Sequence, residues 1–431
     1  MKKHLFFLLL ITAGFVHAQV TIRGKVIDSK EEPLIGAAVY LNNTSIGTTT
    51  NDEGEFELVI KEGVYDLIVS YLGYETLQYQ IDTSKPNKPL TFKTRATANL
   101  LDEIVLNNKR YSKEDRAYFL SRFRKSFIGT SNFSNSCKIL NPNVIKFDYN
   151  KLSHVLEAYV SKPIEIINRD LGYKIYYDLV HFELTNDRIS YLGYTRYVKL
   201  KGSKRRQRKW KRNRLRAYNG SQMHFVRSIM SNTFLEEGFI VDQSKKIPNP
   251  QRPTDEVIKK TRRYLRSLKG GKGSSSGGIT ISSKNSTLNI ATDKIKGVSS
   301  KKKTSPVTSL ELKRDSALTI LKKGRLKKFV KVSLKKKLKQ QDFIIRSGNR
   351  MAIKFQHNLD IRYIHEEEEG NYRPGPGRLK HQASNLTLFT TYVELDKTGT
   401  FVQPLDVFVE GYWSYEKIAD LLPLDYLPTK N

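Results

Sequence analysis

Alternating hydrophobic and polar residues mark the N-terminal part of the chain as a series of short strands. Phe56, Leu58 and Ile60 alternate along one stretch, and the same period of two recurs between Tyr65 and Val69. This period is typical of strands with one buried face. Gly, Pro, Asn and Asp separate the stretches and supply turn chemistry. The pattern predicts a seven-stranded antiparallel β-sandwich over residues 19–95.

Apolar residues recur at helical intervals in four later segments of the chain. Ser112 and Asp115 form a capping pattern at the start of the first, and Gly129 ends it. The second segment has its apolar residues at helical intervals and stops before Gly238. The four predicted helices are Ser112–Gly129, Ser221–Glu236, Thr254–Leu268 and Ser414–Leu422.

The remaining body is rich in strand patterns. The longest period-two run covers thirteen residues from Met351 to Tyr363 and predicts one long strand. Val330 to Leu334 alternate with lysines, which is typical of an exposed strand with one apolar face. Further predicted strands are Val144–Tyr149, His154–Val160, Ile164–Ile167, Lys174–Leu184 and Ile189–Leu200. The fold class is therefore mostly β or α+β, with the sandwich followed by a basic α+β domain.

The first residues, "MKKHLFFLLLITAGFVHA", have the basic start, short apolar run and small final residue of a secretory signal peptide. Elsewhere no run approaches eighteen apolar residues, so we expect no transmembrane helix in the mature chain. The prediction is an exported protein, periplasmic or associated with the outer membrane. Export excludes a physiological nucleic-acid partner.

Shifts in composition predict the domain boundaries. The connector is polar, and the insertion is rich in Lys, Ser, Gly and Pro, including "KGGKGSSSGG" at 269–278. The predicted parts are a signal peptide at 1–18, the sandwich at 19–95, a connector at 96–110, the first part of the α+β domain at 111–242, a basic flexible insertion at 243–306 and a strand-rich second part at 307–431.

Four blocks of the first domain resemble a known family. "GKVID", "EPLIGAAVYL", "GTTTNDEGEFEL" and "YDLIVSYLGYE" are similar to the carboxypeptidase regulatory-like domain, a transthyretin-like β-sandwich of secreted Bacteroidota proteins. The resemblance implies an accessory module without catalytic residues. The same module fronts many TonB-dependent outer-membrane receptors, and "NLLDEIVL" at 99–106 resembles their connector. The chain departs from both contexts, because it has neither a carboxypeptidase catalytic domain nor the length for a receptor barrel.

Positive charge is concentrated in a few segments. The net charge is +32, and the stretch "KGSKRRQRKWKRNRLRAY" at 201–218 has ten basic residues and no acidic one. It is predicted to be a charged loop or a helix start, docked by its tryptophan. As the surface for an anionic partner the sequence nominates Lys204, Arg205, Arg206, Arg208, Lys209, Trp210, Lys211, Arg212, Arg214 and Arg216. The expected partners are lipid phosphates, lipopolysaccharide or an acidic envelope protein; a solvated connection without a partner is the alternative.

Catalytic motifs are absent from the sequence. It has no nucleophile elbow, phosphate loop, dinucleotide fingerprint or His-Glu-x-x-His. His365 and Glu368 have a zinc-ligand spacing, with His381 as a conceivable third ligand, but four adjacent glutamates cannot all face one ion. We therefore expect no catalytic residue, metal or cofactor. Carboxylates that could form a glycosidase pair, though nothing selects them, are Asp178, Glu183, Glu394 and Asp396.

Two residue types allow more than one interpretation. Cys137 is the single cysteine, so it is a small buried hydrophobe or bonds to a partner. The tyrosines between 173 and 197 face a carbohydrate or, as we favour, pack on the next sheet.

The sequence thus predicts a non-enzymatic, exported envelope protein with a binding or accessory role and a basic surface. The two alternatives are an envelope hydrolase acting on glycan or peptide and an accessory component of a TonB-dependent receptor system. Oligomeric state stays open.

Overall fold

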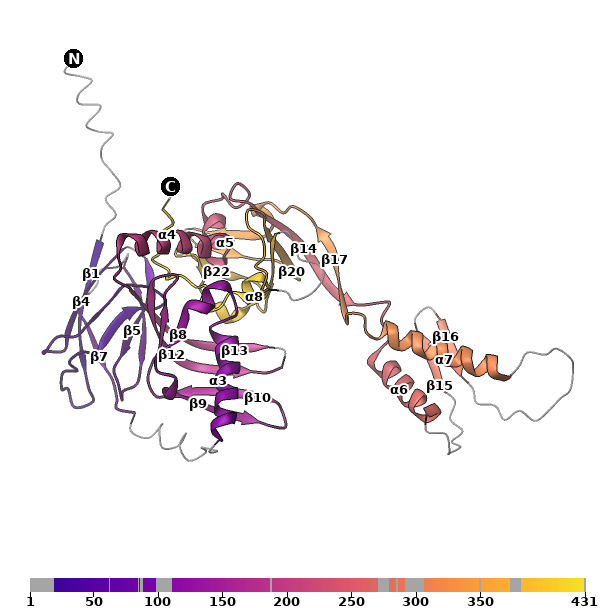
Figure 1. Cartoon of the computed structure of the whole chain (residues 1–431). Coiled ribbons are helices and arrows are strands. Elements are labelled where there is room, and N and C mark those ends of the chain that lie inside the picture. Colours follow the sequence, from indigo (N-terminus) through magenta and orange to yellow (C-terminus); the bar gives the residue numbers. More distant parts are fainter. Residues whose placement is uncertain are drawn as a thin grey trace, which may run out of the picture. The chain divides into compact units, whose positions relative to one another are not determined.

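The computed structural model describes residues 19–97 and 111–429, with gaps at 62, 84, 86–87, 187, 270–278, 284–285, 291–305, 349 and 373–380. These residues divide into two compact units (Figure 1). Unit 1 comprises Met1–Val241 and Lys337–Asn431, and unit 2 comprises Asp242–Lys336. The predicted signal peptide, the "NLLDEIVL" stretch and residues 270–278 of the Gly/Ser run lie outside the described residues.

The N-terminal domain is a β-sandwich of seven strands, as predicted. Its two sheets have the strand orders β4-β1-β7 and β3-β2-β5-β6, and Val26, Leu41 and Leu67 are fully buried between them. One pair departs from the predicted antiparallel arrangement, because β1 and β7 run parallel. The strands are β1 (Gln19–Ile27), β2 (Ala38–Leu41), β3 (Gly47–Thr49), β4 (Glu55–Lys61), β5 (Val64–Ser70), β6 (Leu77–Asp82) and β7 (Leu90–Lys93).

A six-stranded antiparallel sheet covered by one helix follows. Helix α3 (Lys113–Phe127) begins where the Ser112 Oγ accepts a hydrogen bond from the Asp115 N–H at 3.0 Å, which confirms the predicted start. Its Phe119, Phe123 and Phe127 are buried against the sheet, in which β13 pairs with β12. The strands are β8 (Cys137–Ile139), β9 (Ile145–Asn150), β10 (Val155–Val160), β11 (Ile164–Asn168), β12 (Tyr173–Leu184) and β13 (Ile189–Lys199).

Two further sheets share a second core of the body. Their orders are β17-β14-β20-β21-β24 and β18-β19-β22-β23, and helix α5 (Gln222–Met230) contributes Phe225 and Ile229 to the same core. The strands are β14 (Phe239–Pro248), β17 (Phe329–Lys335), β18 (Ile344–Ser347), β19 (Arg350–Ile353), β20 (Asn358–Tyr363), β21 (Gln382–Leu388), β22 (Val393–Asp396), β23 (Thr400–Phe401) and β24 (Val407–Gly411).

The predicted long strand from Met351 to Tyr363 is wrong. The chain forms β19 and β20 there, which belong to different sheets. His357, with a φ of 68°, adopts the left-handed conformation at the corner between them. The apolar residues of the sequence alternate straight through the corner, so the period alone could not reveal it.

Two predicted helices are shorter than expected. Helix α5 ends at Met230, since Asn232 has a φ of 61° and the Thr233 N–H turns back to the Ser228 carbonyl. Helix α8 (Tyr412–Tyr415) has one turn, begins before the predicted Ser414 and does not extend over residues 416–422, where the prediction of a helix is wrong. In both places the apolar residues continue into turns that pack on the core.

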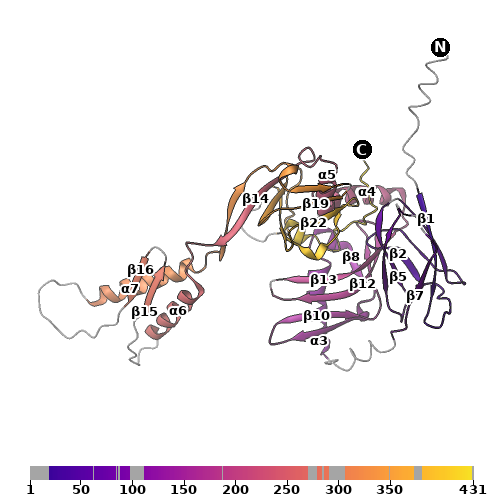
Figure 2. The same ribbon diagram turned by 180° about the vertical axis from the view of Figure 1, so that it is seen from behind.

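The sandwich packs directly on the body (Figure 2). The Thr195 N–H donates to the Asn42 side chain, and the Asn43 N–H donates to the Thr195 carbonyl at 2.7 Å. Asp178 of β12 accepts hydrogen bonds from Tyr40 and from Ser70, the latter at 3.1 Å. The sandwich is therefore joined to β12 and β13 by specific polar contacts.

The described residues of unit 2 form two helices and two antiparallel strand pairs. Helix α6 (Asp255–Lys269) confirms the helix predicted from Thr254 to Leu268, and α7 (Pro306–Lys323) lies beside it. The strands β15 (Ile279–Ser283) and β16 (Ser286–Ile290) form one pair, and β17 pairs with β14. Among the helices of the described residues, none is long and apolar enough to span a membrane.

Candidate functional site

The basic stretch is a helix for most of its length. Helix α4 (Lys204–Tyr218) begins after Ser203, whose carbonyl accepts from the Gln207 N–H at 2.9 Å. Lys, Arg and Gln are good helix formers, which favours this conformation over a loop. Of the two predicted alternatives, the helix is therefore the correct one.

The inner side of α4 is anchored by Trp210, as predicted. This side chain is only 5% exposed, and its indole N–H donates to the Arg169 carbonyl at 2.8 Å. Gly172, with a φ of 72°, lies next to the indole ring, and a Cβ at this position would come within 2.3 Å of the Trp210 Cδ2. Trp210 is thus a docking residue, and its inclusion in the predicted partner surface was wrong.

Arg214 also faces inward. Its Nε donates to the Leu171 carbonyl at 2.7 Å, and its guanidinium lies 4.1 Å from the centre of the Tyr173 ring. The Asn213 side chain adds a hydrogen bond to the Asp170 carbonyl at 2.8 Å. Arg214 therefore holds the helix on the turn before β12 and is not available to a partner.

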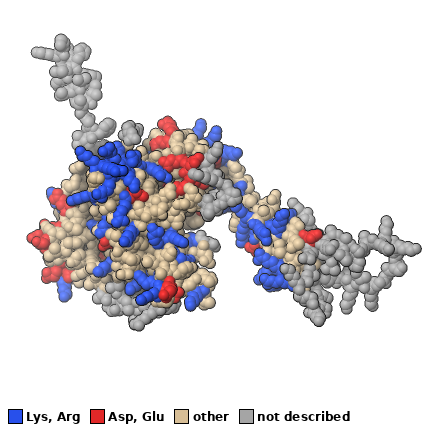
Figure 3. All heavy atoms as spheres, in the orientation of Figure 1, with Lys and Arg blue, Asp and Glu red and all other residues tan. Residues whose placement is uncertain are grey.

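The other eight predicted residues are exposed (Figure 3). Lys209 is paired with Asp170 at 2.6 Å, and Arg216 lies 3.5 Å from Glu369. The remaining six have no acidic partner among the described residues, and we call them the outer face of α4: Lys204, Arg205, Arg206, Arg208, Lys211 and Arg212.

The outer face does not stabilise the helix that carries it. Lys204, Arg208 and Arg212 follow one another at intervals of four residues, so like charges are neighbours on the helix surface. Such pairs destabilise a helix by about 0.2–0.5 kcal/mol each. Docking through Trp210 and Arg214 offsets this repulsion, and the outer face is left with unneutralised charge.

A second candidate site was missed by the sequence analysis. It is a cavity of about 440 Å³ in unit 1, next to Arg216. The four consecutive glutamates were its only signal, and the other lining residues come from several distant segments of the chain. The residues lining this acidic cavity are Asn132, Phe133, Arg216, Ala217, Glu366, Glu367, Glu368, Glu369, Gly370, Gln382, Tyr412, Tyr415, Glu416 and Asp420.

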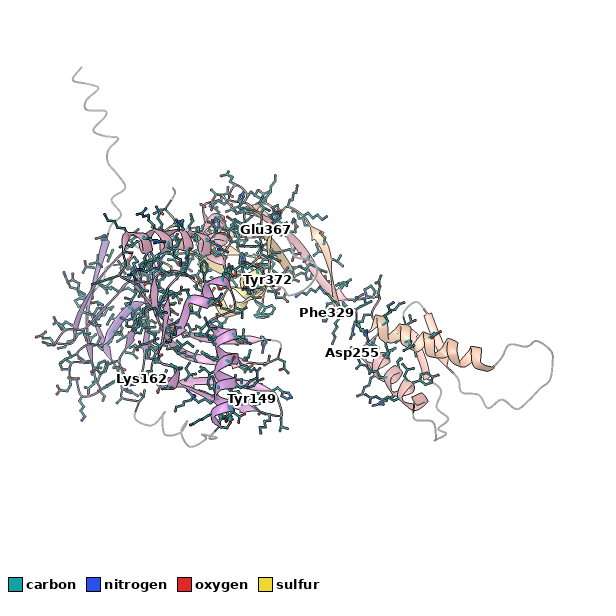
Figure 4. The ribbon with its side chains drawn as sticks, viewed as in Figure 1. Tyr149, Lys162, Asp255, Phe329, Glu367 and Tyr372 are labelled. Carbon is teal, nitrogen blue, oxygen red and sulfur yellow. The ribbon has the colours of Figure 1, made fainter. Side chains whose placement is uncertain are left out.

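Glu369 is held by donors from several elements. Its carboxylate accepts from the Asn132 N–H at 2.9 Å and from the Tyr415 hydroxyl at 3.1 Å. Tyr415 and Tyr412 make edge-to-face contacts with Tyr372, which is labelled with Glu367 in Figure 4. The cavity wall is therefore fixed by hydrogen bonds and aromatic contacts.

Burial changes the protonation of the cavity. It raises the pKa of Asp420 to about 7, although the Lys417 N–H donates to this carboxylate at 3.1 Å. Burial also raises the pKa of Glu366, and it raises that of Glu416 well above the usual range. Near neutral pH the cavity therefore offers carboxylic acids as proton donors as well as carboxylates.

The conceivable zinc ligands are not gathered into a metal site. The His365 ring packs on Tyr363 at 5.6 Å between ring centres, while Glu368 belongs to the acidic cavity. Across the described part of the chain, no three His, Cys, Asp or Glu side chains are arranged to hold a metal ion.

The four carboxylates considered for a glycosidase lie on two strands, Asp178 and Glu183 on β12 and Glu394 and Asp396 on β22. Asp178 bonds to the sandwich, and Glu183 faces Ser190 of β13 in the strand register. Glu394 lies 3.7 Å from Arg350, and Asp396 accepts from the Thr398 N–H at 2.7 Å. None of them lines the acidic cavity.

The tyrosine-rich strands pack inward, as favoured from the sequence. Tyr173, Tyr177 and Tyr197 are buried in the core under α3 and α4. Cys137 is 5% exposed in the same core, and burial raises its pKa to about 12. Its thiol is therefore a protonated core group.

The comparison with protein families concerns the sandwich. The family model of the CarboxypepD_reg-like domain matches residues 22–106. The N-terminal module is a CarboxypepD_reg-like domain. The resemblance stated from the sequence is confirmed for this part of the chain, and the seven-stranded sandwich is its fold.

Two curated relatives share the CarboxypepD_reg-like domain. TonB-dependent receptor SusC of Bacteroides thetaiotaomicron is 35% identical over 20% of this chain and 8% of its own length. TonB-dependent receptor P39 of Formosa agariphila is 29% identical over 26% of this chain and 11% of its own. The chain thus spans about a tenth of the length of the curated relatives that it matches.

A solved DUF3823 family protein from Bacteroides ovatus aligns with 43% of this chain and 83% of its own, at 12% identity. Its TM-score of 0.16 is too low to carry an argument.

Proposed function

We propose that the protein is an exported, non-enzymatic component of the cell envelope that binds an anionic surface through the outer face of α4. The supporting observation is a rigidly docked helix with six exposed cations and no described acidic partner. The N-terminal domain shared with TonB-dependent receptors supports an envelope location. Lipid phosphates are the partner that this charge pattern favours, because each basic residue near an anionic membrane contributes about 1 kcal/mol.

Vesicle co-sedimentation tests this proposal. We expect the protein to bind phosphatidylglycerol vesicles and not phosphatidylcholine vesicles. The triple variant R205Q/R208Q/R212Q removes about 3 kcal/mol of attraction, which corresponds to a loss of affinity on the order of 100-fold. Glutamine retains helix propensity, so α4 keeps its conformation.

Salt and a matched variant control the experiment. Raising NaCl from about 0.1 M to about 1 M shortens the screening length from about 10 Å to about 3 Å and should release the protein. The variant K259Q/R262Q/R266Q loses the same charge in unit 2 and should bind as the wild type does. Binding that resists salt, or equal losses in both variants, would contradict the proposal. If the protein bound an acidic envelope protein and no vesicles, the partner of α4 would be that protein and not a lipid surface.

An accessory role beside a TonB-dependent receptor is the second part of the proposal. Its support is the shared N-terminal domain alone. Co-purification from detergent-solubilised outer membranes tests it: a receptor should remain bound to the full chain and be lost from a chain without residues 19–95. Retention by the shortened chain would show that the domain is not the contact.

A hydrolase is the second candidate function, and the acidic cavity is the observation that favours it. Asp420 and Glu416 are carboxyl groups whose pKa burial raises, as required of a general acid. Assays on peptidoglycan fragments and peptides test it, with D420N as the variant. Hydrolysis that D420N abolishes would establish an enzyme; no turnover of either class would leave the binding function.

A further inference from the structure

Unit 2 has a concave basic site of its own. The packing of α6 on α7 positions the residues of this site. Ile258 and Thr261 of α6 are buried, as is Ala317 of α7. Gly324, directly after α7, lies on Ile258, and a Cβ there would come within 2.9 Å of the Ile258 Cδ1. This contact fixes α6 against the end of α7.

Beside this contact lies a cleft of about 610 Å³, within the range typical of small-molecule sites. Five of its lining side chains are cationic and one is a carboxylate. We call it the α6 cleft; its lining residues are Arg252, Asp255, Ile258, Lys259, Arg262, Arg263, Arg266 and Gly324.

The single carboxylate does not neutralise the cleft. Asp255, labelled in Figure 4, is paired with Arg252 at 2.7 Å and with Lys328 at 3.2 Å. These cations hold the pKa of Asp255 below its ordinary value. Its negative charge is therefore already matched by two positive charges.

Four cations of the cleft remain without such a partner. They follow one another at the spacing of a single helix face, are exposed, and have no acidic partner within the described residues: Lys259, Arg262, Arg263 and Arg266. Lys259 with Arg263, and Arg262 with Arg266, are like charges four residues apart, which destabilise a helix. The folded unit thus keeps a concentrated positive charge that its own residues do not balance.

The geometry of these cations indicates the chemistry of a ligand. From Lys259 to Arg266 the helix axis rises about 10 Å. A guanidinium binds a phosphate through paired N–H donors, and a single phosphate can engage only a part of such a row. We infer that the α6 cleft binds a ligand with two or more phosphate groups, held by Lys259, Arg262, Arg263 and Arg266 over an apolar floor at Ile258.

This site is separate from the proposed membrane contact. The outer face of α4 is one side of a helix, suited to a flat surface, whereas the α6 cleft encloses its ligand. The ligand can be a soluble polyphosphate or the headgroup of a lipid with two phosphates. The two sites have no residue in common, so either proposal can fail without the other.

Calorimetry with the full-length protein tests the site. Inorganic tripolyphosphate should bind at least tenfold more tightly than orthophosphate. The double variant R262Q/R263Q should lose at least tenfold in tripolyphosphate affinity, while R205Q/R208Q, of equal net charge, should keep the wild-type value. Equal losses in the two variants, or no binding to the wild type, would overturn the inference. Circular dichroism checks that R262Q/R263Q keeps its helix content. If R262Q/R263Q does not fold, K259Q/R266Q takes its place.

Further probes distinguish the source of the phosphates. Phosphatidylcholine vesicles that contain cardiolipin, whose headgroup has two phosphates, should bind through the cleft if the ligand is a lipid. In the background of R205Q/R208Q/R212Q, which removes the attraction of α4 to anionic vesicles, remaining vesicle binding that R262Q/R263Q abolishes would assign the lipid source; tripolyphosphate binding without cleft-dependent vesicle binding would assign the soluble one. Heparin bound as tightly as tripolyphosphate, with the same sensitivity to R262Q/R263Q, would overturn the preference for phosphate.

Discussion

Asp420 shows how one residue in the acidic cavity makes stability depend on pH. The residue is 8% exposed, and burial raises the pKa of its carboxyl from 3.8 to about 7. Between these two values the folded state holds a proton that the unfolded state releases. The free energy of unfolding therefore falls as pH rises through this window.

The variant D420N directly tests this loss of stability at high pH. Asparagine keeps the shape and cannot ionise, so the variant should gain stability over the wild type mainly at high pH. We expect the gain in free energy of unfolding to be about 2 kcal/mol larger at about pH 8 than at about pH 5. Urea denaturation at the two pH values measures it, with D52N in an exposed turn as the control. A gain independent of pH would show that Asp420 is ionised throughout.

At the scale of elements, the docking of α4 depends on the absence of a side chain at residue 172. Gly172 has a φ of 72° and leaves room only for the face of the Trp210 indole. Trp210 in turn holds the helix through its N–H bond to Arg169. The outer face of α4 is therefore positioned by a contact on the opposite side of the helix.

G172A should displace Trp210 and loosen α4. Gly36 provides the matched control, because its φ of 77° is similar and nothing lies within 4 Å of the position of its Cβ. G36A should cost about 1 kcal/mol for the left-handed conformation, whereas G172A should cost about 3 kcal/mol through the added loss of packing. Urea denaturation and the tryptophan emission maximum measure the difference. Equal costs would mean that the indole moves aside without consequence.

The same element shows which parts of the structure the sequence could predict. The stretch around Trp210 predicts a docked, charged segment, since a lone aromatic among cations suggests an anchor. The inward direction of Arg214 was not predictable, because its partners are backbone carbonyls of a turn before β12. Local alternation and caps predicted α3, α6 and most strands. The corner at His357 was not predicted, because the apolar residues on both sides of it follow the same period of two in the sequence.

The acidic cavity was beyond sequence analysis for a different reason. The glutamates after β20 meet Glu416 and Asp420 only through the tertiary fold. A charged run in a sequence is most often solvated, and nothing local distinguishes a buried one. The cations of the α6 cleft could have been found from the sequence, since they lie on one face of a predicted helix.

At the scale of the whole molecule, the two units differ in how much of the core they carry. The three described core clusters consist of residues from unit 1 only. Unit 2 is entered and left through β14 and β17, where Pro248 and Phe329 are register partners. The Asn249 N–H donates to the Lys328 carbonyl at 2.9 Å, so the chain leaves and returns at one place.

Unit 2 should therefore be removable without unfolding unit 1. Replacing residues 250–327 by Asn-Gly converts the β14–β17 pair into a hairpin with a two-residue turn, which suits antiparallel strands. Because no residue of the three core clusters is lost, the melting temperature of the unit 1 transition should change by no more than about 2 °C, which corresponds to about 1 kcal/mol for a unit of this size. Calorimetry and near-ultraviolet circular dichroism measure it.

The shortened chain also separates the two proposed binding sites within one experiment. It retains the outer face of α4 and lacks the α6 cleft, so it should still sediment with phosphatidylglycerol vesicles and should no longer bind tripolyphosphate. If unit 1 unfolds on removal of residues 250–327, then unit 2 supports the core by contacts outside the three clusters. If the folded, shortened chain still binds tripolyphosphate as tightly as the full chain, the phosphate site lies in unit 1, and the charge of α6 has another role.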